Sequence, residues 1–427
     1  MLMASQEKRG YSRSGIIALC SIVYFVSYFS RKDFAAAMAG MILDGAVSRE
    51  NAGLVGTMLF AFYGVGQLIS GYLGDRIKPK HLIILGLSVT ALCNGLMPTV
   101  PGWAMIPIWG LNGLAQAMLW PPIVKILSTH LDHKTYVTAN LIVTSAAHVA
   151  TVLLYAYVPL CITFMSWQTV FYSAAALAVV SMTVFAIAMR LVLPADSAHS
   201  DEGEGSADTS RPDDTLHGES ILTVLRKSGV FTVFVCIIVV GFLRDGIESW
   251  LPMLYAEAFG KGASESTLVS IILPVFSILS ISIVTALHRK GILSNEVSGS
   301  AAMFAIALVL AVPLAFFVGM DGAFFRVSSL ILTSLICAAM HGANFLLISC
   351  LPGRFARIGR SATVSGLCNS CVYIGAAIST YGIALISKYM GWPITVATWC
   401  AILCIGIVFA ILSYRRYTTV LKCDDEH

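Results

Sequence analysis

The chain has 427 residues, of which 57% are hydrophobic and 12% are charged, and its mean hydropathy is +0.82. A water-soluble protein carries about 25% charged residues, so the composition excludes a soluble globular protein and predicts an integral membrane protein. The net charge of +4 gives no indication of nucleic-acid binding, and the 11 cysteines are scattered through apolar stretches without a disulfide or metal-binding framework.

Long apolar segments separated by mostly short turns make up most of the chain. Runs of about 20 apolar residues predict membrane-spanning helices, and twelve such runs predict an all-α membrane protein. The basic stretch before the first run, MLMASQEKRGYSRS, leads directly into it, so we expect no cleavable signal peptide. The predicted spans cover residues 15–40, 51–74, 81–99, 102–127, 136–160, 167–190, 228–256, 264–287, 297–318, 326–349, 361–387 and 392–414.

Three charged residues, Arg31, Lys32 and Asp33, interrupt the first predicted span. A charge at the centre of a bilayer costs at least about 2.5–3.5 kcal/mol, so such a residue must face protein or water. Tyr24, Tyr28 and Arg31 share one helix face, which is typical of a cavity wall, although an interhelical hydrogen-bond network without a ligand remains an alternative. Lys32 points to a different face, where we expect it to pair with a neighbouring helix.

Two more residues are predicted to lie near the middle of the membrane. His148 lies in the fifth span, and Arg244 lies in the seventh span, 17 residues after Lys227. Arg31 similarly follows Arg13 by 18 residues. With a rise of about 1.5 Å per residue, both arginines lie roughly 25 Å from the cytoplasmic ends of their helices, so they are expected at similar depth.

These residues favour a small anionic substrate. Planar guanidinium groups match oxyanions, and His148 could donate to the same anion. The sequence offers no obvious matched set of buried acids for the two arginines. The alternatives that need no ligand are an ion pair of Arg244 with Glu248, one turn further along the helix, and a packing role for His148.

An acidic stretch without aromatic residues, 194–220, predicts a disordered cytoplasmic linker. It would divide the chain into two six-helix bundles, residues 1–193 and 221–427. The bundles resemble each other, because Trp167 and Trp392 begin the sixth and twelfth spans. Such a repeat predicts a two-bundle transporter with its substrate path between the halves.

The distribution of Lys and Arg predicts the orientation in the membrane. One side of the predicted topology has only Arg49, Lys261, Arg326 and Lys388 outside the spans, and the other loop and tail cations lie on the opposite side. We therefore expect both termini in the cytoplasm. The expected location is the cell inner membrane, which the chain would cross several times.

The stretch GYLGDRIKPK, after the second span, resembles the loop signature of the major facilitator superfamily. In that signature Gly71, Asp75 and Arg76 would form the gating and structural motif that holds neighbouring helix ends. The superfamily resemblance implies a transporter fold with two pseudo-symmetric six-helix bundles.

Four further stretches, YFSRKDF, WGLNGLAQAMLWPPIVK, SAAHV and FLRDGIESWLPMLY, together resemble the organophosphate:phosphate antiporter family. The resemblance implies that Arg31 and Arg244 hold a phosphoryl group and that His148 assists. Tyr28, Lys32 and Gln67 complete the expected substrate-binding residues. The family usually has a lysine at the position of Gln67, and this departure leaves phosphonate, sulfonate and carboxylate anions open.

The residues and the resemblance together predict a secondary active transporter that exchanges an organophosphate for inorganic phosphate by alternating access. A proton-coupled symporter of another small anion and a transporter-like organophosphate sensor are the alternatives. The sequence shows no nucleotide-binding glycine loop, metal-ligand spacing or nucleophile–base arrangement, so we expect no enzyme activity, cofactor or metal. The expected partners are the small anion and the lipid bilayer, with no nucleic acid, and a monomer would suffice.

Overall fold

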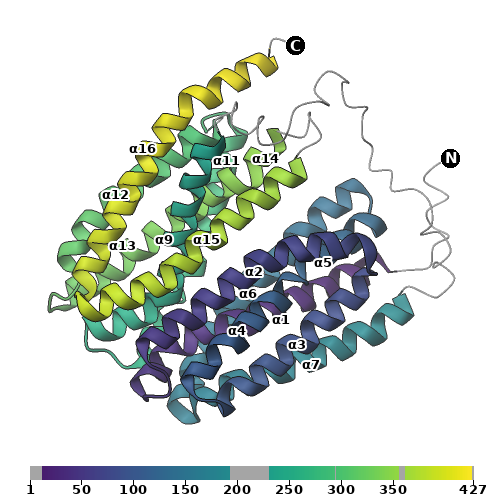
Figure 1. The fold of residues 1–427 in the computed structure, drawn as a ribbon, viewed down its shortest axis with the longest axis horizontal. Helices are drawn as coiled ribbons and strands as arrows, with labels where there is room; N and C mark the ends of the chain where they lie inside the picture. The colour runs from purple at the N-terminus through teal and green to yellow at the C-terminus, as the bar shows by residue number, and fades with distance from the viewer. Residues whose placement is uncertain (1–11, 193–229, 294, 355–360, 426–427) are drawn as a thin grey trace.

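The computed structural model describes residues 12–192, 230–293, 295–354 and 361–425, and the regular elements within them are all helical (Figure 1). We call the first helices the N-terminal group: α1 (Arg13–Leu43), α2 (Arg49–Arg76), α3 (Pro79–Leu96), η1 (Met97–Thr99), α4 (Gly102–Ala117), α5 (Trp120–His130), α6 (His133–Phe164) and α7 (Trp167–Val192). The C-terminal group is α9 (Val230–Ala258), α10 (Ala263–Val269), α11 (Ile272–Arg289), α12 (Glu296–Phe317), α13 (Ala323–Asn344), η4 (Phe345–Cys350), α14 (Leu351–Arg354), α15 (Ser361–Tyr389) and α16 (Gly391–Asp425).

The structure confirms the all-α membrane fold. Within the described residues, ten helical stretches are long and apolar enough to cross a membrane. The remaining two predicted spans also correspond to helices: 228–256 overlaps α9, and 102–127 overlaps α4 and α5. α4 and α5 are separate helices because Pro121 and Pro122 follow the break, and proline cannot donate a backbone hydrogen bond. The fold is consistent with twelve spans, one of them broken.

Several helices begin at polar residues that cap their free backbone N–H groups. The side chain of Ser12 accepts a hydrogen bond from the backbone of Gly15 at the start of α1. Ser48 caps α2 in the same way, Asp132 caps α6 and Asn295 caps α12. These caps stabilise the helix starts and allow very short turns between spans.

The helices form two groups that lie side by side in Figure 1. Within the N-terminal group α1 packs on α6 and α7, and within the C-terminal group α9 packs on α15 and α16. Contacts of α2 with α15 and of α1 with α9 join the groups. The predicted linker, 194–220, lies outside the described residues. The domain limits at residues 193 and 221 therefore stay predictions.

Glycines allow some of these helices to approach each other closely. A Cβ atom added at Gly375 of α15 would lie 2.1 Å from the carbonyl oxygen of Ile238 in α9. The backbones of α15 and α9 therefore touch at this point. Gly382, two turns further along α15, has open space at the same position.

We expect Gly375→Ala to lower the unfolding temperature of the purified protein. The added methyl group would force α9 and α15 apart, and such overpacking costs about 1–3 kcal/mol. Gly382→Ala is the matched control, because alanine stabilises a helix interior by about 0.5–1 kcal/mol relative to glycine. Thermal unfolding in detergent measures both changes. Equal unfolding temperatures for the two variants would contradict the close contact.

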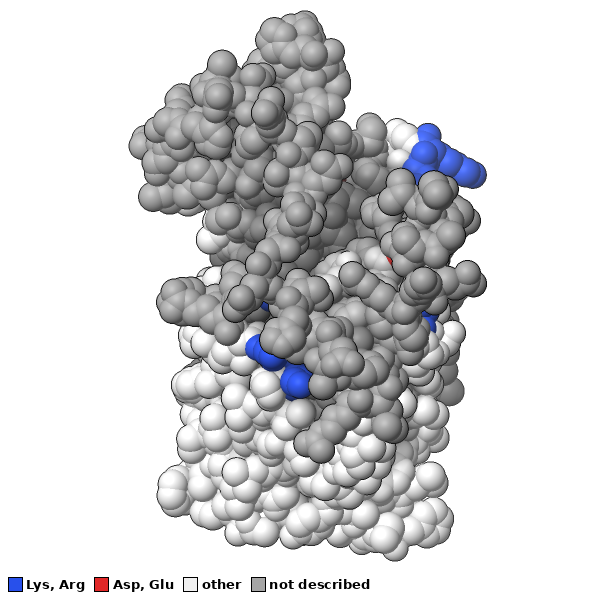
Figure 2. Space-filling view, turned by 90° about the vertical axis from the view of Figure 1, so that its right-hand side faces the viewer, with Lys and Arg blue, Asp and Glu red and all other residues white. Residues whose placement is uncertain are grey.

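The outer surface of the helices is apolar, as a lipid-facing surface requires. Leu141, Val309 and Ile411 expose 63%, 72% and 62% of their surface. Figure 2 shows one side of the molecule, on which the visible Lys and Arg side chains lie in the upper and middle parts. The lower part of the same face is largely uncharged. This distribution agrees with a chain embedded in a bilayer.

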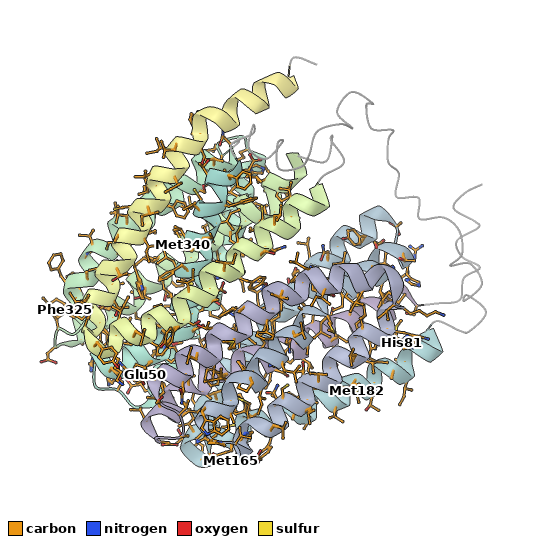
Figure 3. All side chains as sticks on the ribbon, viewed as in Figure 1. Glu50, His81, Met165, Met182, Phe325 and Met340 are labelled. Atoms are coloured by element: carbon orange, nitrogen blue, oxygen red, sulfur yellow. The ribbon has the colours of Figure 1, made fainter. Side chains whose placement is uncertain are left out.

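Ion pairs join the two helix groups at one end of their interface. Arg49 and Glu50, at the start of α2, pair with Glu257 of α9 and Lys388 of α15. The indole of Trp392 also donates to Glu257, over 2.8 Å. Figure 3 shows Glu50 at this end and His81 at the opposite end of the molecule. The predicted topology places this ion-paired end outside the cell.

We expect Glu257→Gln to favour opening of this end. The ion pair with Arg49 joins the two groups, and a pair near the surface contributes up to about 1 kcal/mol. A cysteine introduced at Ala52, a buried cavity residue one turn after Arg49, would then react roughly two- to fivefold faster with an impermeant thiol reagent added outside. The rate is compared with that of Ala52→Cys in the otherwise unaltered chain, and the chain without Ala52→Cys gives the background from the native cysteines.

The matched control is Glu265→Gln. Glu265 pairs with Lys261 over 2.9 Å, but both residues belong to the C-terminal group. Its loss should leave the thiol reaction unchanged. A faster reaction in the control, or an unchanged one in Glu257→Gln, would contradict the role of the Arg49–Glu257 pair.

Candidate functional site

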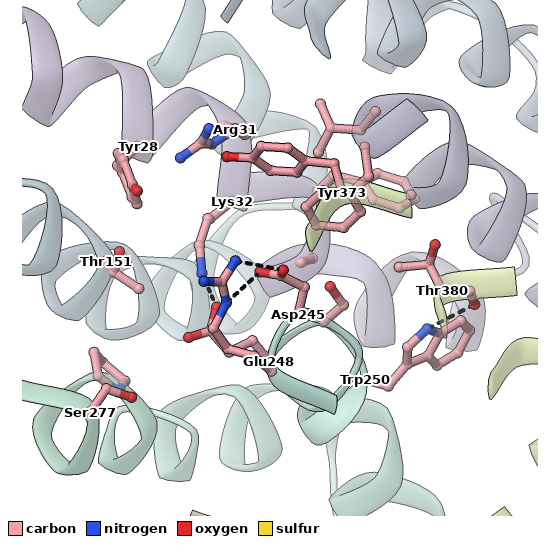
Figure 4. A pocket seen from close by; sticks show the side chains of 18 of the residues that line it. Tyr28, Arg31, Lys32, Thr151, Asp245, Glu248, Trp250, Ser277, Tyr373 and Thr380 are labelled. Carbon is pink, nitrogen blue, oxygen red and sulfur yellow. Dashed lines mark hydrogen bonds and ion pairs between the residues drawn. The ribbon is translucent and has the colours of Figure 1, made fainter. Parts of the chain in front are cut away.

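A cavity of about 310 Å³ lies between the two helix groups. Helices α1, α2, α4 and α6 contribute its lining from one side, and α9, α11, α13 and α15 from the other. Figure 4 shows charged side chains meeting aromatic and hydroxyl side chains there. The charged and histidine residues among the described lining are Arg31, Lys32, His148, Arg244, Asp245, Glu248 and His341.

Arg31 faces the cavity from α1 and lies against aromatic rings. Its guanidinium carbon lies 4.2 Å from the ring centre of Tyr28 and 4.9 Å from that of Tyr63. Such cation–π contacts stabilise the charge but leave the N–H groups of the guanidinium free to donate. Among the described residues, no carboxylate forms an ion pair with Arg31. Tyr24, Tyr28 and Arg31 lie on one helix face as predicted, since the two tyrosine rings lie 5.1 Å apart, but only Tyr28 and Arg31 of the three line the cavity.

Arg244 has a carboxylate partner, which corrects the sequence analysis. Its Nε donates to one oxygen of Asp245 over 3.3 Å, and its Nη2 donates to the other over 2.7 Å. The expectation that the arginines lack matched acids is wrong for Arg244, and so is the alternative of a pair with Glu248. One edge of the planar group is therefore already used, and Arg244 is also one of the residues that line the cavity.

Lys32 links the two helix groups through Glu248. Its ammonium forms an ion pair with one carboxylate oxygen of Glu248 in α9, which confirms the expected pairing of Lys32 with a neighbouring helix. The other carboxylate oxygen lies 2.8 Å from Nε2 of His341 in α13. α1, α9 and α13 thus meet in one polar network. In Figure 4 Lys32 and Glu248 meet in the middle of the cavity.

The same network contains a set of metal-ligand types. One donor atom each of Glu248, Cys337 and His341 lies within 4.8 Å of the others, and this combination is suited to Zn²⁺. However, the ammonium of Lys32 already occupies Glu248, and Arg31 and Arg244 add positive charge nearby. A divalent cation would therefore be repelled, so we interpret the set as an ion-pair network.

His148 of α6 also lines the cavity, and its side chain is half-buried. Its Nδ1 lies 3.0 Å from the carbonyl oxygen of Thr144, one turn earlier, which fixes the orientation of the ring. Gln67 of α2 is half-buried and is not among the lining residues of this cavity. The structure therefore brings Tyr28, Arg31, Lys32, His148 and Arg244 together and leaves Gln67 apart.

The loop-signature residues Gly71, Asp75 and Arg76 lie at the end of α2. The side chains of Asp75 and Arg76, and the surroundings of Gly71, fall outside what the structure describes. Their predicted role in holding helix ends stays a prediction.

Some residues at or beside the cavity escaped the sequence analysis: Tyr373 and His341 line it, and Tyr63 lies behind Arg31 without lining it. Tyr63 and Tyr373 come from different helix groups, yet their ring centres lie only 4.5 Å apart beside Arg31. His341 was missed although it is a histidine within a predicted span, which is the same signal that marked His148. The two tyrosines carry no comparable signal, because aromatic residues are common in apolar spans.

A buried polar cluster holds the Arg31 segment in place. The backbone carbonyl of Ser30 accepts hydrogen bonds from Asn94 of α3 over 3.2 Å and from Asn112 of α4 over 3.1 Å. The hydroxyl of Ser27 donates to Gln116 of α4 over 2.5 Å. These contacts fix α1 directly behind its cavity face, so the position of Arg31 is set by a rigid support.

Comparison with known proteins places this geometry among transporters. Residues 20–380 match the family model of the Major Facilitator Superfamily. A bacterial homolog of the human lysosomal transporter Spinster, solved in an inward-facing and occupied conformation, has a TM-score of 0.75 to this chain at 14% identity. The alignment covers 95% of this chain and 98% of that one. At this identity the likeness concerns the fold alone.

Curated relatives share shorter stretches. A probable hexose phosphate transport protein of Chlamydia trachomatis is 33% identical over 128 residues, which are 29% of this chain and 27% of the relative. A glycerol-3-phosphate transporter of Bacillus subtilis is 25% identical over 258 residues, 57% of this chain and 58% of the relative. The alignments thus span less than two thirds of either relative. They confirm the resemblance to the organophosphate:phosphate antiporter family.

Proposed function

Because the chain belongs to the Major Facilitator Superfamily, we propose that it is a secondary active transporter of a small organic anion. The observation that carries this proposal is the position of Arg31. Its guanidinium lies in a cavity between the two helix groups, and no described carboxylate pairs with it. A buried charge of this kind is stabilised by an opposite charge, which a bound oxyanion would supply.

The substrate class follows from the donors around the cavity. Arg31 offers the planar, multiply donating group that suits phosphoryl and carboxylate oxygens, and His148 and Arg244 line the same cavity. The relatives named for hexose phosphate and glycerol 3-phosphate support an organophosphate. We infer that this organophosphate is exchanged for inorganic phosphate.

The exchange mechanism rests on the cost of an uncompensated charge. Alternating access requires the cavity to close completely between its two open forms. In the empty cavity Arg31 would be sealed away from water without a counter-charge, which is strongly unfavourable. A bound anion removes this barrier in either direction. The empty carrier would therefore return slowly, and one anion would be exchanged for another.

We also propose a membrane location, an orientation and an oligomeric state for the chain. The chain is a multi-pass membrane protein, and the positive loops favour cytoplasmic termini in a cell inner membrane. The two helix groups and the cavity between them lie within one chain, so we infer that a monomer suffices.

Counterflow in proteoliposomes tests the function. Vesicles loaded with phosphate are diluted into labelled phosphate, and candidate organophosphates are then added outside as competitors. We expect rapid exchange of labelled phosphate that a small organophosphate inhibits. Uptake that depends on a pH gradient and ignores internal phosphate would instead identify a proton-coupled symporter. Specific binding without any exchange would identify a sensor.

A further inference from the structure

The described lining of the cavity carries one more positive than negative charge. Its cations are Arg31, Lys32 and Arg244, and its carboxylates are Asp245 and Glu248. Three positive charges minus two negative charges leave a net charge of +1 when the histidines are counted as neutral. The charge of a bound anion therefore adds to the charges of the two carboxylates that are already in the cavity lining.

Two of the three cations are already neutralised. Arg244 uses Nε and Nη2 to hold both carboxylate oxygens of Asp245, which is only 7% exposed. Lys32 pairs with Glu248, whose side chain is 12% exposed. These carboxylates are held firmly, because Glu248 also contacts His341 over 2.8 Å. If a ligand drew either Arg244 or Lys32 away from its carboxylate, that buried carboxylate would be left without its partner.

Arg31 is the remaining cation of the described lining, and the tyrosine rings against its guanidinium carry no formal charge. Tyr28 and Tyr63 face the guanidinium with their rings, and the ring of Tyr373 lies tilted against that of Tyr63, with the ring centres 4.5 Å apart. A single negative charge on the ligand would make the cavity neutral. A second one would leave a net charge of −1 in a poorly solvated space, close to Asp245 and Glu248, and this is costly.

We infer that the site selects small oxyanions that carry one net negative charge when bound, rather than dianions. This inference rests on the proposed function and narrows its substrate class. Phosphodiesters and singly protonated phosphate or phosphonate esters share this chemistry. Asp245 and Glu248 act as the specificity-determining residues, since they cancel the two cations that would otherwise attract a dianion.

Two probes of similar size separate the charge states. Dimethyl phosphate is a permanent monoanion, whereas methyl phosphate is mainly a dianion at pH 8, because the second pKa of a phosphate monoester is about 6. Calorimetric titration of the purified full chain measures the binding of each. We expect dimethyl phosphate to bind at least roughly tenfold more tightly, which corresponds to about 1.4 kcal/mol. Tighter binding of methyl phosphate to the unaltered protein would overturn the inference.

Asp245→Asn should reverse this preference, because it raises the net charge of the cavity to +2. Asp245→Glu keeps the charge and should keep the preference for the monoanion. Asp132→Asn is the control for overall charge, since Asp132 lies exposed at the start of α6 and pairs with Arg13 over 3.2 Å. An unchanged preference in a folded Asp245→Asn protein would contradict the inference.

The comparison on the unaltered protein does not depend on the folding of any variant. If neither anion binds, the proposed anion transport fails, and this inference fails with it. If both bind and the dianion is preferred, only the charge selection is wrong.

Discussion

Replacing Arg31 by lysine is expected to slow phosphate exchange roughly 10- to 100-fold while the protein remains folded. Lysine keeps the positive charge, but it is a point charge that lacks the planar group able to hold two oxygens of one anion. A hydrogen bond to a charged group contributes about 1.5–3 kcal/mol, and each 1.4 kcal/mol corresponds to about a factor of ten. Initial rates of counterflow in proteoliposomes measure the effect.

Arg13→Lys is the matched control for this substitution. Arg13 lies in the same helix, but it is exposed at the helix start and pairs with Asp132. We expect its exchange rate to equal that of the unaltered protein. If Arg31→Lys exchanged phosphate at the normal rate and affinity, the planar contact with the anion would be wrong. The anion would then have to bind elsewhere in the cavity.

The fold was largely predictable because membrane helices have a strong local signal. Each span shows a long apolar run, and the structure confirms a helix at each of them. The break between α4 and α5 is less apparent from hydropathy. It depends on Pro121 and Pro122, which stop one helix and start another without interrupting the apolar run. Length and composition therefore give the span but not its internal geometry.

The residues of the cavity were predictable where a charge lies at membrane depth. Arg31, Lys32 and Arg244 stand out in this way, and all three line the cavity. Their partners were harder to predict. Residues next to each other in a helix point to different sides, so helical spacing does not predict the pair of Arg244 with Asp245. In the structure the two side chains nevertheless form an ion pair over 2.7 Å.

Contacts between residues from distant parts of the chain could not be predicted from the sequence alone. His341 reaches Glu248 only because α13 packs against α9. Tyr373 reaches Tyr63 only because α15 packs against α2 across the two helix groups. Spacing along one helix does not contain this information. The consequence is that the charges could be located from sequence, but the net charge of the cavity could not.

The network of Lys32, Glu248 and His341 gives this cavity a second property, the coupling of the two helix groups. Lys32 belongs to the N-terminal group, and its partners belong to the C-terminal group. Breaking a buried ion pair by removing one partner costs about 3–5 kcal/mol, because the other charge is left uncompensated. We therefore expect Glu248→Gln to lower the unfolding temperature strongly and to abolish most exchange.

A double-mutant cycle distinguishes this pair from a simple loss of packing. Lys32→Met combined with Glu248→Gln removes both charges, and replacing a buried pair by neutral groups is often close to neutral for stability. The double variant should therefore be more stable than Glu248→Gln alone, with a coupling energy of about 0.5–3 kcal/mol. Thermal unfolding in detergent gives all four stabilities. Additive losses would show that Lys32 and Glu248 act independently, and the link between the groups would then depend on other contacts.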